Sequence, residues 1–308
     1  MIKVQRPVLT ALCLILSIAA LGLSLICLLN GHQPQLYFID IFTLPILMGI
    51  GIQTACFFFI GQKKAGGLSA LAVSILALSI IPQAFPEQRQ ADRTTVPIRI
   101  LFANLWIGNP TPAHILPWIK QQNPDVIAFL ETNPYTRAPL MSAITASRPY
   151  VYVRYDTVVV SRWPLRDGHP IHYGFALNRV IVEAPQGPFE LDVAHLYRPW
   201  PYTNPGVHPA QFGKLALALS PVDQKRRVLV GDFNTPPLAS DMQDFTKATG
   251  LHTAGALWGT WNAHLPGALR INIDNALASP DLVFTRRGVG PFNGSDHRPI
   301  VVDIQSAR

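Results

Sequence analysis

Eight polar side chains have a similar setting in the sequence. Each one lies at an end of a short apolar run or within such a run. They are Asn104, Glu131, His195, Asp232, Asn234, Asp274, Asp296 and His297. If these runs pair as strands, groups at their ends converge at one edge of a sheet. Converging carboxylates, imidazoles and amides are typical of a catalytic site. Asp274 is informative because a lone carboxylate in an apolar strand is costly to bury unless it is paired.

Short runs rich in β-branched residues predict the strands that would carry these groups. The predicted strands are Ile98–Leu105, Asp125–Glu131, Val151–Val153, Thr157–Ser161, Asn178–Glu183, Phe189–His195, Arg227–Gly231, Ile271–Ser279 and Arg298–Ile304. Helices are predicted around His114–Gln122 and over Pro209–Leu219 and Ser240–Thr249. Many strands with few helices favour an α/β fold in which two packed mixed sheets are covered by helices.

Charge is distributed unevenly along the 308 residues. Only 14% of the chain is charged, whereas soluble domains carry about 25%. Residues 1–86 hold four Lys or Arg and one acid, and the remainder holds 21 and 17. This composition excludes a disordered chain, a coiled coil, a disulfide scaffold and a single homogeneous soluble domain. We expect a membrane anchor over residues 1–85, a polar linker over 86–97 and a globular part over 98–308.

Three uncharged apolar runs predict three transmembrane helices. Val8–Leu29, Ile41–Ile60 and Gly67–Phe85 contain 22, 20 and 19 residues, and about 20 residues cross a bilayer. The first run exceeds the roughly 7–15 apolar residues of a signal peptide, and no cleavage site of small residues follows it. An anchor is therefore favoured over a cleaved signal.

Basic residues near these runs predict the orientation of the anchor. Lys3 and Arg6 precede the first run, and Lys63 and Lys64 lie between the second and third. The loop Asn30–Asp40 has no Lys or Arg. Because cytoplasmic loops carry the excess of basic residues, we expect a multi-pass protein of the cytoplasmic (inner) membrane with a cytoplasmic N-terminus. The globular part would then be extracytoplasmic, which is periplasmic in a Gram-negative cell.

An ordered set of sequence blocks resembles the endonuclease/exonuclease/phosphatase superfamily, which has the fold of deoxyribonuclease I. The blocks are FANL, PDVIAFLET, VVVSRWPL, VAHL, VGDFN, IDNALAS and SDHRPIV, between Arg99 and Ile304. Each block alone is weak, but all of them occur in family order. The resemblance implies a four-layer α/β sandwich and cleavage of a phosphoester or phosphoanhydride that depends on Mg²⁺ or Mn²⁺.

The resemblance also implies a metal site. Glu131 would supply a carboxylate oxygen and Asn104 an amide oxygen, and Asp296 would complete the site directly or through water. Magnesium prefers such oxygen ligands and keeps several waters. Family nucleases often have a second Asn or Asp two residues after the first, but Trp106 stands there. This departure weighs against a two-metal arrangement.

The catalytic roles implied by the resemblance fall on five residues. His297 would lie close to the scissile phosphate, oriented by Asp274. Asp232 would activate or position the attacking water, and Asn234 would donate to a phosphate oxygen or to the metal shell. His195 would donate to a nonbridging oxygen, although the sequence assigns it no partner carboxylate.

The substrate is less constrained by the sequence. Arg198 and Arg162 are weak candidates for binding the substrate phosphate. A 12-residue linker reaches at most about 40 Å, so the site would work near the membrane on a lipid or lipid-linked phosphate. VanJ-type glycopeptide-resistance proteins also place three helices before this domain, and that similarity implies hydrolysis of undecaprenyl pyrophosphate. The alternatives are an extracytoplasmic nuclease acting on nucleic acid, another phosphodiesterase such as a sphingomyelinase-like enzyme, and a membrane scaffold with an inactive domain. No protein partner is predicted.

Overall fold

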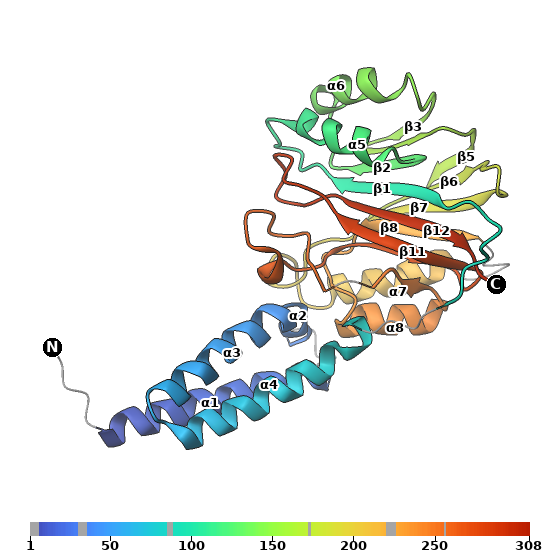
Figure 1. Ribbon diagram of the computed structural model, residues 1–308. Helices are drawn as coiled ribbons and strands as arrows, with labels where there is room; N and C mark the ends of the chain where they lie inside the picture. The colour runs from blue at the N-terminus through green and yellow to red at the C-terminus, as the bar shows by residue number, and fades with distance from the viewer. Residues whose placement is uncertain (1–5, 30–35, 85–88, 172–173, 220–225, 256) are drawn as a thin grey trace.

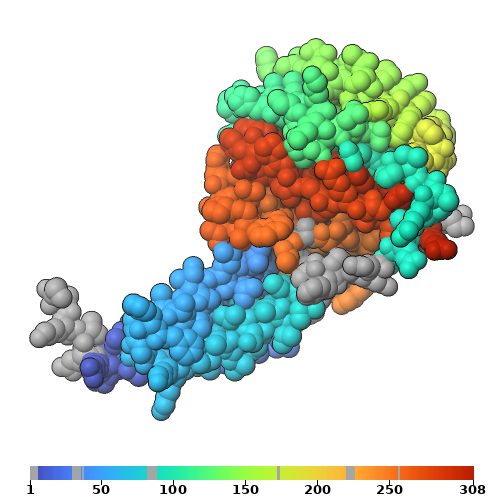
Figure 2. All heavy atoms as spheres, in the orientation of Figure 1, coloured from blue at the N-terminus to red at the C-terminus, as the bar shows by residue number. Residues whose placement is uncertain are grey.

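The computed structural model describes residues 6–29, 36–84, 89–171, 174–219, 226–255 and 257–308. It has two parts (Figure 1): an elongated group of apolar helices and a larger part built from two sheets. Figure 2 shows that the helices form a separate lobe that meets the larger part at one end. The start of α1 lies at the end of this lobe that is away from the sheets.

Among the residues that the structure describes, the helical part contains four helices rather than three uniform spans. They are α1 (Arg6–Leu28), α2 (Tyr37–Ile41), α3 (Thr43–Phe59) and α4 (Lys63–Ala84). Within the described residues, Arg6–Leu28 and Lys63–Ile81 are long and apolar enough to cross a membrane, whereas α3 has 17 residues and is shorter. The second predicted span differs because the helix is interrupted at Phe42, whose backbone leaves the helical region. The first residue of that run, Ile41, therefore belongs to α2.

Polar contacts hold the long helices together. The Ser17 hydroxyl donates to the Ala65 carbonyl at 3.0 Å, and the Ser69 hydroxyl donates to Ser17 Oγ at 3.0 Å. The Gln53 amide of α3 donates to Ser69 Oγ at 2.9 Å. Small and polar residues of this kind are typical of contacts between helices in membranes.

The outward faces of the lobe are apolar. The side chains of Ile15 and Ile18 on α1, and of Leu71 and Leu78 on α4, are all more than half exposed. A helix of a soluble protein turns such a face toward a core. These faces are compatible with a membrane anchor.

The larger part contains two six-stranded sheets. The first has the order β11-β12-β1-β2-β4-β3 and the second β5-β6-β7-β8-β10-β9. The strands of the first sheet are β1 (Ile98–Asn104), β2 (Val126–Leu130), β3 (Tyr150–Arg154), β4 (Thr157–Ser161), β11 (Leu282–Val289) and β12 (Ile300–Ser306). Those of the second are β5 (Leu165–Pro170), β6 (Ala176–Val182), β7 (Phe189–His195), β8 (Arg227–Asp232), β9 (His252–Thr253) and β10 (Asp274–Ala278).

Helices cover the outer face of each sheet. The first sheet is covered by η1 (Pro112–Ile115), α5 (Leu116–Gln122) and α6 (Pro134–Ile144), and the second by α7 (Val207–Leu219) and α8 (Ser240–Thr249). A short η2 (Gly267–Leu269) precedes β10. The largest apolar core lies between the two sheets and contains Phe102, Leu130, Leu191 and Val230. The predicted two-sheet α/β sandwich is confirmed.

The predicted linker is not a free tether along its whole length. Residues 86–88 lie outside the described residues. Beyond them, Arg89 Nη1 donates to the Pro280 carbonyl at 3.2 Å and Asp92 N–H donates to the Ser306 carbonyl at 2.9 Å. The Arg308 N–H returns a bond to the Gln90 carbonyl at 3.0 Å. The part of the predicted linker that begins at Arg89 therefore packs against the sandwich near the C-terminal end of the chain.

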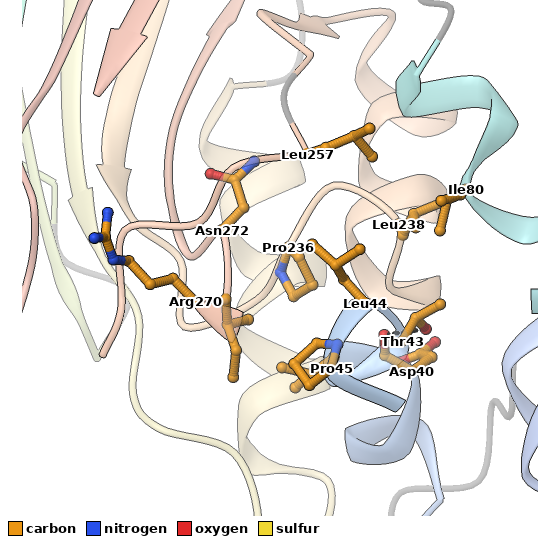
Figure 3. A pocket seen from close by; sticks show the side chains of 12 residues that line it. Asp40, Thr43, Leu44, Pro45, Ile80, Pro236, Leu238, Leu257, Arg270 and Asn272 are labelled. Atoms are coloured by element: carbon orange, nitrogen blue, oxygen red, sulfur yellow. Dashed lines mark hydrogen bonds between the residues drawn. The ribbon is translucent and has the colours of Figure 1, made fainter. Parts of the chain in front are cut away.

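The lobe also contacts the sandwich through α2. One Asp40 carboxylate oxygen accepts a hydrogen bond of 2.9 Å from the Ser240 N–H at the start of α8. Ile41 packs with Ala239 and Ile271 of the sandwich. Figure 3 shows the small pocket at this junction, where Asp40 and its neighbours in α3 lie opposite Pro236, Leu238 and Arg270.

Candidate active site

The strand pairing brings polar residues together at one edge of both sheets. In the second sheet, His195 of β7 and Asp274 of β10 both pair with Asp232 of β8. In the first sheet, Asn104 ends β1 and Glu131 follows β2, which runs parallel to it. Because parallel strands end at the same edge, these groups face one another across the sandwich.

Asn104 bridges the two sheets. Its Nδ2 donates to Glu131 Oε1 at 2.8 Å and to Asp232 Oδ2 at 3.1 Å. Its Oδ1 accepts the Trp106 N–H at 2.9 Å. The amide is therefore positioned as a donor to two carboxylates, and its oxygen already has a backbone partner.

Glu131 lies in an unusual backbone conformation, with φ of 53°. A non-glycine residue rarely adopts positive φ, and such residues gather at functional sites. Its Oε2 accepts the Ile107 N–H at 3.2 Å. Burial would raise the pKa of Glu131, but the hydrogen bond from Asn104 and the nearby His195 outweigh it, so the pKa is lowered. The carboxylate is thus kept in its anionic form.

His195 has two carboxylate neighbours that the sequence did not identify. Its Nε2 lies 3.7 Å from Glu131 Oε1 and 3.8 Å from Asp232 Oδ2. These three residues form a group whose ligand atoms lie within 4.8 Å of one another. Burial raises the pKa of the Asp232 carboxyl. The positive charge of His297 opposes this rise, and the negative charge of Asp274 adds to it.

His297 forms the second cluster with Asp274 and Asp232. Its Nδ1 lies 2.8 Å from Asp274 Oδ2, and its Nε2 lies 3.8 Å from Asp232 Oδ2. Burial would lower the pKa of His297, but the charges of Asp274 and Asp232 raise it to about 10. The neighbouring carboxylates therefore favour the protonated ring, and Nε2 is directed toward the centre of the site.

Asn234 and Asp296 lie at the margin of the cluster. The Asn234 N–H donates to Asp232 Oδ1 at 2.9 Å, and its Nδ2 donates to the Leu196 carbonyl at 2.9 Å. Only its second amide hydrogen is left to reach a phosphate oxygen. Asp296 Oδ2 accepts from the Trp261 indole at 3.1 Å, and its Oδ1 lies 3.9 Å from His297 Nε2.

The donor set fits a divalent cation with a preference for oxygen. Asp296 Oδ1 and Asp274 Oδ1 are buried and have no hydrogen-bond partner among the described residues. A buried carboxylate oxygen without a donor is costly, and a cation beside it would remove that cost. Glu131 and Asp232 add two further carboxylates, which suits the oxygen ligands of Mg²⁺ or Mn²⁺.

The two predicted phosphate-binding arginines have different locations. Arg198 follows β7 and borders the same pocket as Asn234. Arg162 follows β4, where its Nε lies 3.4 Å from Asp125 Oδ1. Asp125 precedes β2, whereas Glu131 follows it, so Arg162 lies at the opposite end of that strand. The structure does not bring Arg162 to the cluster, so its position does not support the prediction that it binds the substrate phosphate.

Two positioning residues, Ser295 and Thr260, were not found from the sequence. Ser295 Oγ donates to the Asn104 carbonyl at 2.9 Å and accepts the His297 N–H at 3.0 Å. Thr260 Oγ1 accepts the Asp274 N–H at 3.2 Å. Ser295 lies in the SDHRPIV block, which was the available signal, whereas nothing in the sequence distinguishes Thr260.

Several solved structures share the fold of the larger part of the chain. An endonuclease/exonuclease/phosphatase from Beutenbergia cavernae DSM 12333 is 19% identical, with a TM-score of 0.54 over 69% of this chain and 72% of that one. Sphingomyelinase C from Streptomyces griseocarneus is 13% identical, with a TM-score of 0.52 over 68% and 99%. The human Nocturnin catalytic domain, solved with a bound sulfate anion, is 18% identical, with a TM-score of 0.54 over 73% and 99%.

Sequence comparison gives the family. A search of curated proteins finds no match. The family model described as the Endonuclease/Exonuclease/phosphatase family matches residues 101–297. This range runs from β1 to His297 and contains all eight polar residues of the candidate site. The chain therefore belongs to the endonuclease/exonuclease/phosphatase family.

Proposed function

We propose that this protein is a divalent-metal-dependent hydrolase of phosphoester or phosphoanhydride bonds that acts at the outer face of the cytoplasmic membrane. The observation that carries the proposal is the convergence of Asn104, Glu131, His195, Asp232, Asp274 and His297 at one edge of the sandwich. A binding scaffold has no need for two clusters of carboxylates and imidazoles, one buried and one half-buried, whose assembly costs stability.

Each residue has a role in the proposed reaction. The cationic His297, held by Asp274, donates from Nε2 to a phosphoryl oxygen and offsets the charge that develops there. The buried Asp232 accepts a hydrogen bond from the attacking water and orients it. His195, beside Glu131 and Asp232, donates to a second phosphoryl oxygen. Asn104 keeps Glu131 and Asp232 at a fixed separation.

A divalent cation fits beside this machinery. Glu131 and Asp232 would hold it, and Asp296 would complete the site directly or through water, with Mg²⁺ as the first choice and Mn²⁺ as the second. When bound, such an ion polarises a phosphoryl oxygen and stabilises negative charge on it.

We further propose that α1, α3 and α4 all cross the membrane. Seventeen residues in α3 are at the lower limit for a spanning helix. The N-terminal end of the lobe lies away from the sandwich, whereas α2 contacts it. The loop before α3 and the sandwich must therefore lie on the same side. This agrees with the positive-inside orientation, in which Lys63 and Lys64 face the cytoplasm.

The proposed substrate is a lipid-linked phosphate or pyrophosphate, such as undecaprenyl pyrophosphate. Support comes from the closeness of the site to the lobe. Asn234 of the site and Phe38 of α2 border the same pocket. A site held beside the bilayer meets substrates confined to that surface at high effective concentration.

Hydrolysis by the full-length protein with Mg²⁺ tests the proposal. The substrates are undecaprenyl pyrophosphate, duplex DNA and sphingomyelin, with Glu131→Ala and His297→Ala as variants. We expect phosphate release from the lipid pyrophosphate and a loss of about 10²-fold or more in both variants. Glu183→Ala and His169→Ala, outside the site, are matched controls that should keep full activity. Cleavage of DNA or sphingomyelin with no release from the lipid pyrophosphate would reject the proposed substrate.

A reporter fused after Arg308 tests the orientation. We expect activity from a reporter that works only outside the cytoplasm and none from its cytoplasmic counterpart. The reverse result would overturn the proposed topology without affecting the proposed chemistry.

A further inference from the structure

An apolar pocket of about 210 Å³ lies between the helical lobe and the candidate active site. Its walls come from both parts of the chain and are mostly aromatic or aliphatic. The main apolar contributors are Phe38 and Phe42 from the segment between α1 and α3, and Trp200, Trp261, Ile271 and Ile273 from the sandwich. The rings of Phe38 and Trp200 meet edge to face, with centroids 5.4 Å apart.

The pocket borders two residues that are hydrogen-bonded to the candidate catalytic cluster. Asn234 borders the pocket, and its N–H donates to Asp232 Oδ1 at 2.9 Å. Trp261 also borders it, and its indole N–H donates to Asp296 Oδ2 at 3.1 Å. A molecule in the pocket would therefore lie next to a phosphate held at the cluster.

The pocket also borders the helical lobe. Phe38, Ile41 and Phe42 line it, and they belong to the segment that joins two apolar helices. The outward faces of α1 and α4 are apolar. The pocket thus connects a surface suited to lipid with a cluster suited to phosphate.

Arg198 is the one charged residue among those that line the pocket. Its guanidinium lies over the Tyr202 ring, 5.6 Å from the centroid. Among the described residues, no carboxylate lies within ion-pair distance of it. An exposed arginine at the border of an apolar pocket is suited to the anionic end of an amphiphile.

We propose that this pocket binds the hydrocarbon chain of a phosphorylated membrane lipid, at the segment that adjoins the phosphate. The inference rests on the proposed function and names its substrate class: single-chain lipids with a terminal phosphate or pyrophosphate. A cavity of about 150 Å³ holds a benzene ring, so this pocket takes a short segment of the chain and leaves the rest in the bilayer. Phe38 and Phe42 are then specificity-determining residues supplied by the anchor.

Binding of chain-length probes tests the inference without relying on hydrolysis. The full-length protein in lipid nanodiscs is titrated with Mg²⁺ and ethyl, octyl or dodecyl phosphonate, whose carbon–phosphorus bond resists cleavage. We expect affinity to rise by about tenfold or more from ethyl to octyl, and little further from octyl to dodecyl within the pocket. Phe42→Ala should reduce this gain by about tenfold. Phe59→Ala, a matched change at the exposed far end of α3, should keep it.

A second measurement locates the chain. An octyl phosphonate that carries a bromine on its chain should quench tryptophan fluorescence, and Trp200→Phe should remove much of that quenching. Trp258→Phe, which alters an exposed tryptophan outside the pocket, should keep it. Equal affinities for ethyl and octyl phosphonate, or quenching that is indifferent to Trp200→Phe, would overturn the inference. The proposed function fails separately, if no phosphate is released from any lipid pyrophosphate while the chain-length gain persists.

Discussion

The Asp40 carboxylate accepts a hydrogen bond of 2.9 Å from the Ser240 N–H, 200 residues later in the chain. The contact fixes the helical lobe to the first turn of α8. Acidic groups are favourable at a helix N-terminus, but this carboxylate is buried and its second oxygen has no partner among the described residues. The strength of this contact between the lobe and α8 therefore depends on the protonation state of the Asp40 carboxyl.

Asp40 should make the stability of the protein depend on pH. Burial raises the pKa of Asp40 from 3.8 to about 7, the Ser240 hydrogen bonds oppose the rise, and Asp241 adds to it. Between these two values the folded chain holds a proton that the unfolded chain has lost, so stability falls as pH rises through this interval. Asp40→Asn should flatten the fall and raise the Tm above pH 7, as measured by thermal unfolding of the full-length protein. Parallel pH profiles for the two proteins would contradict this reading.

Asn104 is expected to act as a donor rather than as a metal ligand. Its Nδ2 donates to Glu131 and Asp232, and its oxygen accepts a backbone N–H. Asn104→Ala and Asn104→Asp should both lower kcat by about 10- to 100-fold, because neither side chain can donate to two carboxylates. If Asn104 instead binds the metal through oxygen, Asn104→Asp will keep Mg²⁺ affinity and activity. Calorimetric titration with Mg²⁺ beside steady-state kinetics distinguishes the two roles.

Asp274 should act through His297. The two are joined by a 2.8 Å contact, and both are buried. We expect Asp274→Asn to lower kcat by about 10- to 100-fold, and His297→Ala to lower it further. The double variant should be no worse than His297→Ala alone, since residues that act as a unit are not additive. Additive losses in the double-mutant cycle would show that Asp274 contributes independently.

Arg198 and Arg162 provide a matched pair of substitutions that tests which arginine binds the substrate. Arg198→Ala should raise KM for an anionic substrate by about tenfold, because Arg198 borders the pocket that reaches Asn234. Arg162→Ala should leave KM and kcat unchanged, because Arg162 pairs with Asp125 at the opposite end of β2. A KM effect of Arg162→Ala as large as that of Arg198→Ala would mean that the anionic substrate extends across the sandwich.

The position of Arg162 shows where sequence reasoning ends. The runs that became β4 and β2 were both recognised, but the sequence does not give their relative direction. The two strands are antiparallel, with Val126 opposite Ser161. The end of β4 therefore meets the start of β2, away from Glu131. Asn104, His195 and Asp232 were predicted from their positions at the ends of apolar runs. The structure brings them together because β1 and β2, and β7 and β8, pair in parallel and end at the same edge.

Elements missed from the sequence have local reasons. Helix α6 contains Pro139, which disfavours a helix interior, although its Asn133–Thr136 capping box was a signal for its start. Strand β11 contains charged residues and an irregularity between Phe284 and Arg286, which hide the alternation of a strand. The docking of Asp40 on Ser240 could not be foreseen, because it joins distant segments through tertiary packing alone.

Gly231 should be required for the geometry of the site, since it precedes Asp232 in β8, beside β7. A Cβ built on Gly231 would lie 2.1 Å from the Ala194 carbonyl oxygen, so Gly231→Ala must separate the strands that carry Asp232 and His195. We expect a loss of about 1–3 kcal/mol in unfolding free energy and a fall in kcat, measured by denaturant unfolding and kinetics. Gly213→Ala in α7, where a Cβ meets nothing within 4 Å, is the matched control and should be neutral or stabilising. A stable, fully active Gly231→Ala protein would show that β7 and β8 can separate without disturbing the cluster, which would contradict the dependence of the site on their register.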